Sequence, residues 1–211
     1  MKTLIIQYTP RNKQSTTKQL LDSFLKNCDD DIEILDLTKS APEFLFENAI
    51  SAMMKRNHGG AMLNASEQSV LKNIDRMTQQ FVKADAVVFA FPMYNFSMPG
   101  IVKTYLDLVA QRGQTWDIDA NGNYVGKMKG KRALILMSCA GVYNEEPYKS
   151  WDHTFGLMKT ILSFMGFAPI QMVAAQGTAI PDMQSTLLAQ AIQNTLTIAH
   201  TWNASMPTLA K

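Results

Sequence analysis

An aromatic, amide-rich turn, Pro92-Met93-Tyr94-Asn95-Phe96, follows the apolar run Ala86-Val87-Val88-Phe89-Ala90. Such a run is typical of a strand buried on both faces of a parallel sheet. Open parallel sheets bind ligands beyond the carboxyl ends of their strands, where the strand order reverses. The Asn95 side chain can donate and accept hydrogen bonds, and Pro92 and Met93 can pack on a flat ring. The turn is therefore a candidate ligand loop.

Three residues of this turn have further candidate roles. The backbone N–H groups of Tyr94, Asn95 and Phe96 can face the polar edge of a bound ring, and the Phe96 side chain can form one wall of a substrate site. For Tyr94 and Phe96, simple packing at the end of a strand stays an alternative.

A second candidate loop follows the first strand. Pro10 ends that strand, and the hydroxyl residues Ser15, Thr16 and Thr17 stand where helical spacing begins. Free N–H groups and the helix dipole favour an anion such as phosphate at a helix start. The glycine patterns of P-loop and Rossmann sites are missing, which disfavours a nucleoside triphosphate or a conventional dinucleotide. The alternative that Ser15 only caps the helix stays open.

A third loop, Ser138-Cys139-Ala140-Gly141, ends another apolar strand. Gly141 permits close approach of the backbone to a ligand, and the N–H groups of the turn can contact a polar edge. Neither Cys139 nor Ala140 supplies a side-chain charge. A lone cysteine with no CxxC partner is more often a small buried filler than a redox centre, and we predict this for Cys139.

These loops need alternating strands and helices to position them. We predict strands over residues 2–8, 32–37, 86–91, 132–138 and 170–175, and helices over 15–27, 42–55, 66–83, 99–112, 150–165 and 183–203. In helix 66–83, the polar residues Ser66, Gln68 and Ser69 form the expected start. In the strand order 2-1-3-4-5, strands 1 and 3 flank the switch point, which places the first two loops together.

Two segments exceed the usual loop length. The first, Asn57-His58-Gly59-Gly60-Ala61, can bend over a pocket or contact a second subunit. The second runs from Thr115 to Gly126 around Asn121-Gly122, which predicts a β-hairpin. In this hairpin, Trp116 and Tyr124 are candidates for a pocket or a dimer interface, and cross-strand packing is the alternative.

The composition is typical of one compact cytoplasmic domain. With 211 residues, of which 46% are hydrophobic, the chain can bury a substantial core, and we predict a single domain over residues 1–211. No apolar run approaches the roughly 20 residues that a membrane helix needs. The N-terminus enters the first strand at once, so we expect no signal segment. Cys28 and Cys139 are far apart in the chain, so we expect reduced thiols.

The charge and the histidines argue against a nucleic-acid-binding protein, an electron carrier and a metal site. A net charge of +2 with scattered Lys and Arg argues against nucleic-acid binding. It also argues against an electron carrier, because such carriers typically have a strongly acidic surface that docks on basic partners. The three histidines, His58, His153 and His200, stand in separate segments without metal-ligand spacing, so we expect no metal site.

In the order and spacing of these motifs, the chain resembles the FMN-dependent NADH:quinone and azo-compound reductases. The resemblance is carried by Thr9, the Ser15–Thr17 triplet, the turn at 92–96, the segment Pro99-Gly100-Ile101-Val102-Lys103 with Asp107, and the loop 138–141. It runs from Met1 to about Asn203. The resemblance implies a flavodoxin-like three-layer α/β sandwich, with a five-stranded parallel sheet in 2-1-3-4-5 order and helices on both faces.

The resemblance also implies a set of cofactor contacts. The FMN phosphate would lie on the first loop, at Thr9, Arg11, Ser15, Thr16 and Thr17. The ring would lie beside the other two loops, at Pro92, Met93, Tyr94, Asn95, Phe96, Ser138, Cys139, Ala140 and Gly141. Of these, Asn95, Phe96 and Tyr94 would act on the reaction. The substrate pocket would be lined by Trp116, Tyr124, Tyr143 and His58.

The implied activity is two-electron transfer from NADH or NADPH to quinones and azo compounds by a ping-pong route, with nitro compounds as a further acceptor class. Arg11, Arg56 and Arg112 are candidates for the 2′-phosphate of NADPH. The resemblance implies a homodimer in which both subunits close each pocket. Two alternatives stay open: an electron carrier for a protein partner, and a flavin-free binding protein that keeps the architecture.

Overall fold

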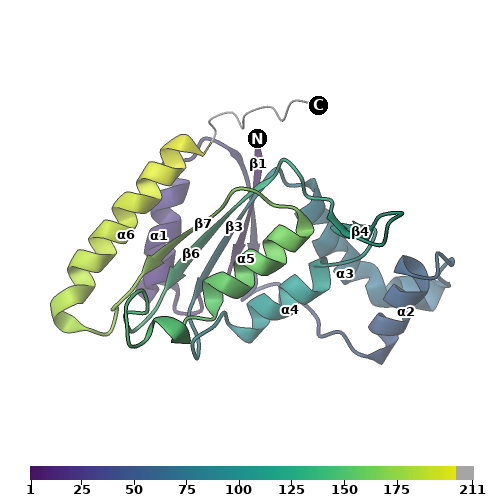
Figure 1. Ribbon diagram of the computed structural model, residues 1–211, viewed down its shortest axis with the longest axis horizontal. Coiled ribbons are helices and arrows are strands. Elements are labelled where there is room, and N and C mark those ends of the chain that lie inside the picture. Colours follow the sequence, from purple (N-terminus) through teal and green to yellow (C-terminus); the bar gives the residue numbers. More distant parts are fainter. Residues whose placement is uncertain (203–211) are drawn as a thin grey trace.

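The computed structural model describes residues 1–202, and its centre is a five-stranded parallel sheet (Figure 1). The strands are β1 (Lys2–Gln7), β2 (Asp31–Asp36), β3 (Ala86–Pro92), β6 (Arg132–Ser138) and β7 (Ile170–Ala175), in the order β2-β1-β3-β6-β7. This is the predicted 2-1-3-4-5 order, because β4 (Trp116–Ile118) and β5 (Tyr124–Gly126) belong to a separate hairpin. β1 and β3 are neighbours at the switch point.

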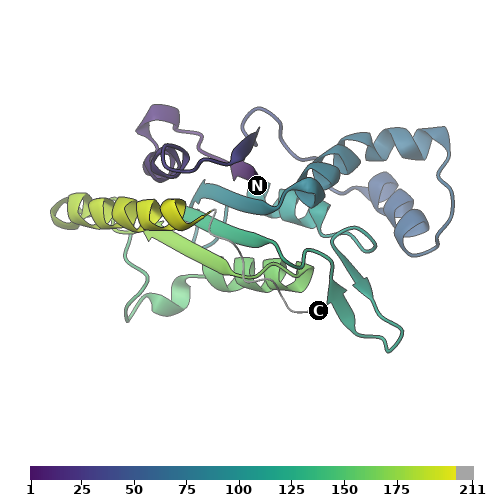
Figure 2. The same cartoon turned by 90° about the horizontal axis from the view of Figure 1, so that it is seen from above.

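Helices cover both faces of the sheet, as predicted (Figure 2). On one face lie α1 (Thr16–Leu25) and α6 (Pro181–Thr201), and on the other lie α3 (Ala65–Lys83), α4 (Gly100–Val109) and α5 (Thr154–Met165). α2 (Glu47–Asn57) packs on α3 at the far end of the molecule. Side chains alternate between the two cores along each strand, because successive residues of a strand point to opposite faces.

The helix starts lie within five residues of the predicted ones, and those of α2 and α3 show what sets them. α2 begins at Glu47, because residues 41–46 run without helical structure after Ser40. α3 begins at Ala65, and its cap is Asn64: the Asn64 side chain accepts from the Glu67 N–H, and the Glu67 carboxylate accepts from the Asn64 N–H. Ser66 is therefore inside the first turn and does not begin the helix. This capping box satisfies two backbone donors at once.

The end of α4 and the start of α5 also differ from the prediction. α4 ends at Val109 and not at Arg112, because the Gln111 N–H turns back to the Val109 carbonyl and the Thr115 hydroxyl. Before α5, residues Lys149–Trp151 form a separate 3-10 turn, and Asp152 accepts the N–H of Thr154. The predicted end of the last helix at Asn203 lies outside the described residues.

The predicted hairpin is confirmed, with β4 (Trp116–Ile118) antiparallel to β5 (Tyr124–Gly126) around a loop that contains Asn121 and Gly122. It leaves the main sheet and packs against the C-terminal end of α5. The backbone of Gly126 approaches Gly166 so closely that an added Cβ would lie 2.4 Å from the Gly166 nitrogen. Trp116, Tyr124 and Phe164 form a triangle of rings with centroids 5.1–5.7 Å apart.

Candidate ligand site

A cavity of about 180 Å³ lies at the carboxyl ends of the central strands, where the three predicted loops meet. The chain reaches it from β1, β3, β6 and β7, so the switch point of the sheet positions it. Its lining is Pro10, Arg11, Ser15, Thr16, Pro92, Met93, Tyr94, Ser138, Cys139, Ala140 and Thr178. Ten of these eleven residues belong to the three loops that the sequence singles out.

The first loop presents donors at the start of α1. The Ser15 hydroxyl accepts from the Lys18 N–H at 3.2 Å, so Ser15 is the N-cap and also lines the cavity. The N–H groups of Thr16 and Thr17 belong to the first turn of the helix and have no carbonyl partner within it. Arg11 lines the cavity, and its guanidinium has no hydrogen bond or ion pair to any residue in the described range 1–202.

Two other residues of this loop, Thr9 and Thr17, do not line the cavity. Thr17 is fully buried, and its hydroxyl bonds the Ser138 hydroxyl at 2.7 Å, which joins the first turn of α1 to the end of β6. Thr9 is also buried, and its carbonyl accepts the Asn12 N–H. Both residues shape the loop through these contacts.

The second loop forms a tight turn with an unusual backbone. Tyr94 and Ser97 exchange two backbone hydrogen bonds, of 2.9 and 3.1 Å. Between them, Asn95 and Phe96 have φ angles of +46° and +70°, in the left-handed region. This region is uncommon for a bulky residue, costs about 1–3 kcal/mol and is frequent at functional sites.

The turn decides which backbone donors remain available. The Tyr94 N–H bonds Ser97, so it cannot face a ligand as the sequence suggests. The N–H groups of Asn95 and Phe96 have no partner among residues 1–202, and both side chains are exposed. Asn95 and Phe96 lie next to the cavity lining and not in it.

The third loop is held by the segment after β7. The carbonyls of Cys139, Ala140 and Gly141 accept hydrogen bonds from the N–H groups of Thr178, Ala179 and Gly177, respectively. The N–H groups of Ala140 and Gly141 have no partner among the described residues. Since its carbonyls are fixed, the loop offers these N–H groups at the cavity.

Cys139 is a buried free thiol that donates to the Gly141 carbonyl at 3.4 Å. Burial, with the negative charge of Asp152 as a smaller cause, raises the pKa of the Cys139 thiol to about 12. A thiol with this pKa is not a nucleophile at neutral pH, in agreement with the predicted filler role. Cys28 is also free and buried.

Thr178 is a lining residue that the sequence reasoning missed. Its hydroxyl donates to the Cys139 carbonyl at 3.1 Å, and it follows Gly177, whose φ is +64°. The available signal was positional, since Thr178 follows the carboxyl end of the fifth parallel strand, where ligand loops are expected.

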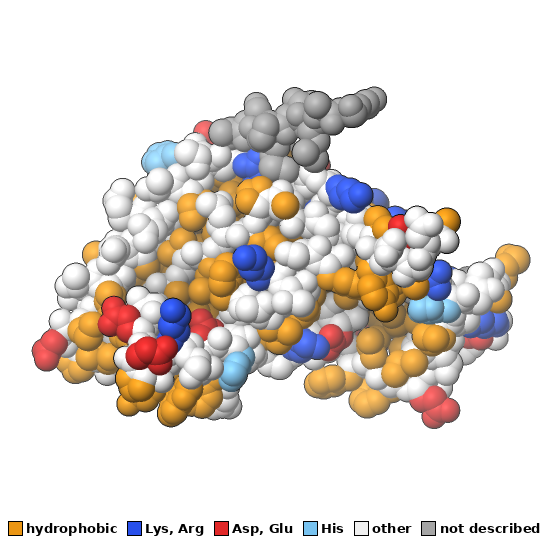
Figure 3. All heavy atoms as spheres, in the orientation of Figure 1, with side chains coloured by type: hydrophobic (Ala, Val, Ile, Leu, Met, Phe, Trp, Pro, Cys, Tyr) orange, Lys and Arg blue, Asp and Glu red, His pale blue; other side chains and the backbone are white. Residues whose placement is uncertain are grey.

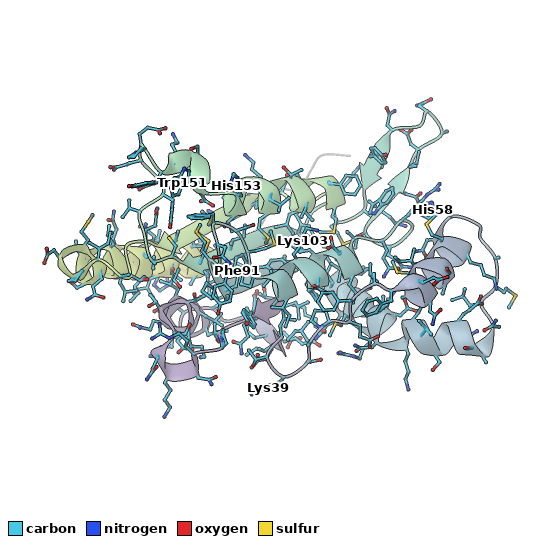
Figure 4. The ribbon with its side chains drawn as sticks, turned by 90° about the horizontal axis from the view of Figure 1, so that it is seen from below. Lys39, His58, Phe91, Lys103, Trp151 and His153 are labelled. Atoms are coloured by element: carbon cyan, nitrogen blue, oxygen red, sulfur yellow. The ribbon has the colours of Figure 1, made fainter. Side chains whose placement is uncertain are left out.

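The four residues assigned to a substrate pocket do not lie together in one chain. Tyr143 packs on Phe96 beside the first cavity, with ring centroids 6.1 Å apart. Trp116 and His58 line a second cavity of about 230 Å³ between α2 and the hairpin, and Tyr124 packs on Trp116. Figure 4 shows His58 near one end of the molecule, far from Trp151, which is the ring next to Phe96. Within one subunit these residues lie at two separate places, so a pocket shared by all four would need both subunits and stays a prediction.

Two of the candidate arginines are engaged by other residues. Arg56 makes two hydrogen bonds to Asp75, of 2.7 and 3.0 Å. Arg112 bonds Asp117 and contacts the His58 ring. Arg11 alone of the three lines the first cavity. Within residues 1–202 no cluster of three or more metal-ligating side chains occurs, and no helix there has the length and hydropathy to cross a membrane.

Comparison with known proteins identifies the family. The family described as having a flavodoxin-like fold matches residues 1–198. FMN-dependent NADH:quinone oxidoreductase 1 of Bacillus subtilis is 32% identical over 193 residues, 89% of this chain and 92% of that protein. The FMN-dependent NADH:quinone oxidoreductase of Azospirillum brasilense is 32% identical over 200 residues, 92% of this chain and 95% of that protein.

Solved structures agree with this. An FMN-dependent NADH-azoreductase from Bacillus anthracis, solved in complex with FMN, has a TM-score of 0.84 and 27% identity over 95% of this chain and 98% of that one. A second azoreductase from Bacillus anthracis shares the fold, with a TM-score of 0.88 and 24% identity over 95% of this chain and 99% of that one. The chain thus belongs to the flavodoxin-like family that includes the FMN-dependent NADH:quinone oxidoreductases.

Proposed function

We propose that the chain is an FMN-dependent oxidoreductase that transfers electrons from NADH to quinones and azo compounds. One observation carries the proposal: the cavity at the switch point combines anion-binding groups at one end with apolar side chains and free N–H groups at the other. The names of the relatives at 32% identity support the same activity.

The groups at the α1 end fit a phosphate. The N–H groups of Thr16 and Thr17, the Thr16 hydroxyl and the guanidinium of Arg11 are all donors without an acceptor in the described chain. A helix start favours a negative charge, and Arg adds a charge-assisted hydrogen bond. Thr9 and Thr17 support this end by fixing the loop.

The groups at the other end fit a flavin ring. Pro92 and Met93 offer apolar surface, and the N–H groups of Asn95, Phe96, Ala140 and Gly141 are free to donate. Bound FMN supplies hydride chemistry, and fixed donors stabilise the negative charge that this chemistry develops. In the proposal, Asn95 and these N–H groups orient the ring, Tyr94 lines its edge, and Phe96 forms one wall of the acceptor site.

The finer assignments belong to the same proposal. The route is ping-pong, because the donor and the acceptor would use the same exposed face beside Phe96. NADPH is a second possible donor and nitro compounds are a further acceptor class. We also propose a cytoplasmic location, in line with two cysteines that are both free thiols.

The test is anaerobic stopped-flow mixing of the purified, FMN-loaded protein with NADH or NADPH, followed by a panel of quinones and azo compounds. We expect full bleaching of the flavin absorbance by a nicotinamide and its return on mixing with an acceptor. A protein that holds no FMN would contradict the assignment. One that holds FMN but is reduced only by a protein partner would instead be an electron carrier.

We also propose that two copies associate, with the hairpin of each near the ligand cavity of the other. The support is apolar surface around the second cavity, seen at the right of Figure 3. Tyr124 is 68% exposed, and Phe44 and Phe46 are 68% and 72% exposed. Burying such rings in one two-fold interface would stabilise a dimer.

Sedimentation equilibrium at micromolar concentration checks this association, with about twice the 23.6 kDa chain mass as the expected result. Replacing Trp116 by Ser should weaken both subunit association and acceptor reduction, because Trp116 lines the second cavity and packs on Tyr124. A monomer with full activity would contradict the shared site and leave the FMN assignment in place.

A further inference from the structure

Four aromatic side chains form a continuous row beside the ligand cavity. Tyr143 contacts Phe96, Phe96 contacts Trp151, and Trp151 contacts Tyr148, with ring centroids 6.1, 5.2 and 5.1 Å apart. All three contacts are edge-to-face, an arrangement that leaves ring faces available to a further ring. We call these four residues the aromatic row. It extends outward from the turn that carries Tyr94 of the cavity lining.

The row is exposed, although large rings are usually covered. Phe96, Trp151 and Tyr148 are 39%, 46% and 49% exposed. Figure 3 shows hydrophobic side chains gathered at the lower left, and Figure 4 shows Trp151 and His153 together just before α5. Contiguous exposed apolar surface next to a pocket is typical of a binding site.

The backbone holds the row in place. The His153 N–H donates to the Phe96 carbonyl at 3.0 Å, and the Trp151 N–H donates to the Tyr148 carbonyl at 3.0 Å. The left-handed φ of Phe96, +70°, is a strained conformation that this packing maintains. A row fixed in this way presents a preformed surface, so a ligand need not order it.

The charges near the row disfavour an anionic ligand. The segment before α5 carries Glu145, Glu146, Lys149 and Asp152, which are three carboxylates and one ammonium group. Recognition at the row would therefore depend on ring stacking and apolar contact, and the matching ligand is a flat aromatic molecule that extends beyond the cavity.

We propose that Trp151, together with Phe96, selects acceptors with two aromatic rings. This inference rests on the proposed function and adds a specificity residue to it. The reacting ring of the acceptor lies over the cavity, and the second ring lies against Trp151. A single-ring quinone reaches only the cavity, so Trp151 contributes nothing to its binding.

The test compares Trp151→Ala and Trp151→Phe with the parent, using FMN-loaded protein and two acceptors with the same reacting group, 1,4-naphthoquinone and 1,4-benzoquinone. We expect Trp151→Ala to raise the KM for naphthoquinone about tenfold, the size of one lost aromatic contact with its burial, while kcat changes less than twofold. The benzoquinone constants should stay within twofold of the parent. Trp151→Phe should restore most of the naphthoquinone affinity.

Met183→Ala is the matched control, because Met183 is an apolar side chain that is 42% exposed on α6 and is not one of the four residues of the row. If Trp151→Ala raises the KM values of both quinones equally, or of neither, the proposal is overturned. A Trp151→Ala protein that sediments at half the mass of the parent would also overturn it, because the row would then be a subunit contact. Calorimetric titration of the oxidised protein with naphthoquinone separates the role of the aromatic row from the proposed function. Tight binding that depends on Trp151 without any reduction by a nicotinamide would sink the proposed function and support the row.

Discussion

Replacing Gly126 by Ala is expected to lower the free energy of unfolding by about 3 kcal/mol, the upper range for overpacking. An added Cβ would lie 2.4 Å from the Gly166 nitrogen and 2.5 Å from the Met165 carbonyl carbon. Both atoms are backbone at the end of α5, so no side-chain rotation can relieve the clash. The hairpin would have to move away from α5, and the packing of Trp116 and Tyr124 on Phe164 would be lost with it.

Urea unfolding of the FMN-free protein, followed by far-UV circular dichroism, measures this effect. Gly156→Ala is the control. Gly156 lies in α5, the helix that the hairpin packs against, and nothing lies within 4 Å of an added Cβ at that position. This control should stabilise the protein by about 0.5–1 kcal/mol, because Ala is the better helix former. If Gly126→Ala unfolds at the parent's urea midpoint, the hairpin does not pack as closely as the structure shows.

The fold follows from the sequence where one local pattern decides it. The buried strands β3 and β6 lack polar alternation, and the hairpin has Asn121-Gly122 in its loop. A short sequence segment is therefore enough to predict each of these elements. Helix boundaries were less certain, because capping depends on side-chain geometry. Asn64 and Ser66 are both good caps by type, and only the reciprocal bonds with Glu67 select Asn64.

The site could be predicted as a set of loops but not as a set of contacts. Strand order brings the loops after β1, β3 and β6 together, and this order is a property of the fold class. The fold class does not determine the direction of each side chain. The Thr17 hydroxyl bonds Ser138, and the left-handed turn at Asn95 and Phe96 uses the Tyr94 N–H internally.

The position of Tyr143 relative to His58 shows the same limit over a longer distance. The resemblance assigns both residues to a pocket that two subunits close, and within one subunit α2 and the hairpin lie at one end of the molecule while the loop after β6 lies beside Phe96. A helix that packs on another helix beyond the sheet edge, as α2 does on α3, has no signature in its own periodicity.

The structure also changes which variant best tests the phosphate end. Ser15 and Thr17 are the obvious hydroxyls, but Ser15 caps α1 and Thr17 bonds Ser138, so their replacement would weaken the fold as well as any ligand contact. Arg11 is exposed and lines the cavity, and its guanidinium has no partner among residues 1–202. Its replacement should therefore report on ligand binding alone.

Arg11→Gln is expected to raise the dissociation constant of FMN by about 10- to 100-fold, the range for losing one hydrogen bond to a charged group. The loss should shrink at high salt, because screening weakens the attraction between the guanidinium and the phosphate. Fluorescence titration of FMN-free protein at low and at high ionic strength measures both effects. Riboflavin, which lacks the phosphate, should bind the variant and the parent equally.

Lys13→Gln is the matched control for charge. Lys13 is a neighbouring exposed cation in the short 3-10 turn Asn12–Gln14, and it does not line the cavity. It should therefore change FMN affinity less than threefold if contact with the phosphate, and not the general positive potential, is responsible. Equal losses in the two variants would mean that the loop attracts the ligand only at long range. A loss of riboflavin binding in Arg11→Gln would place this side chain at the ring end of the cavity.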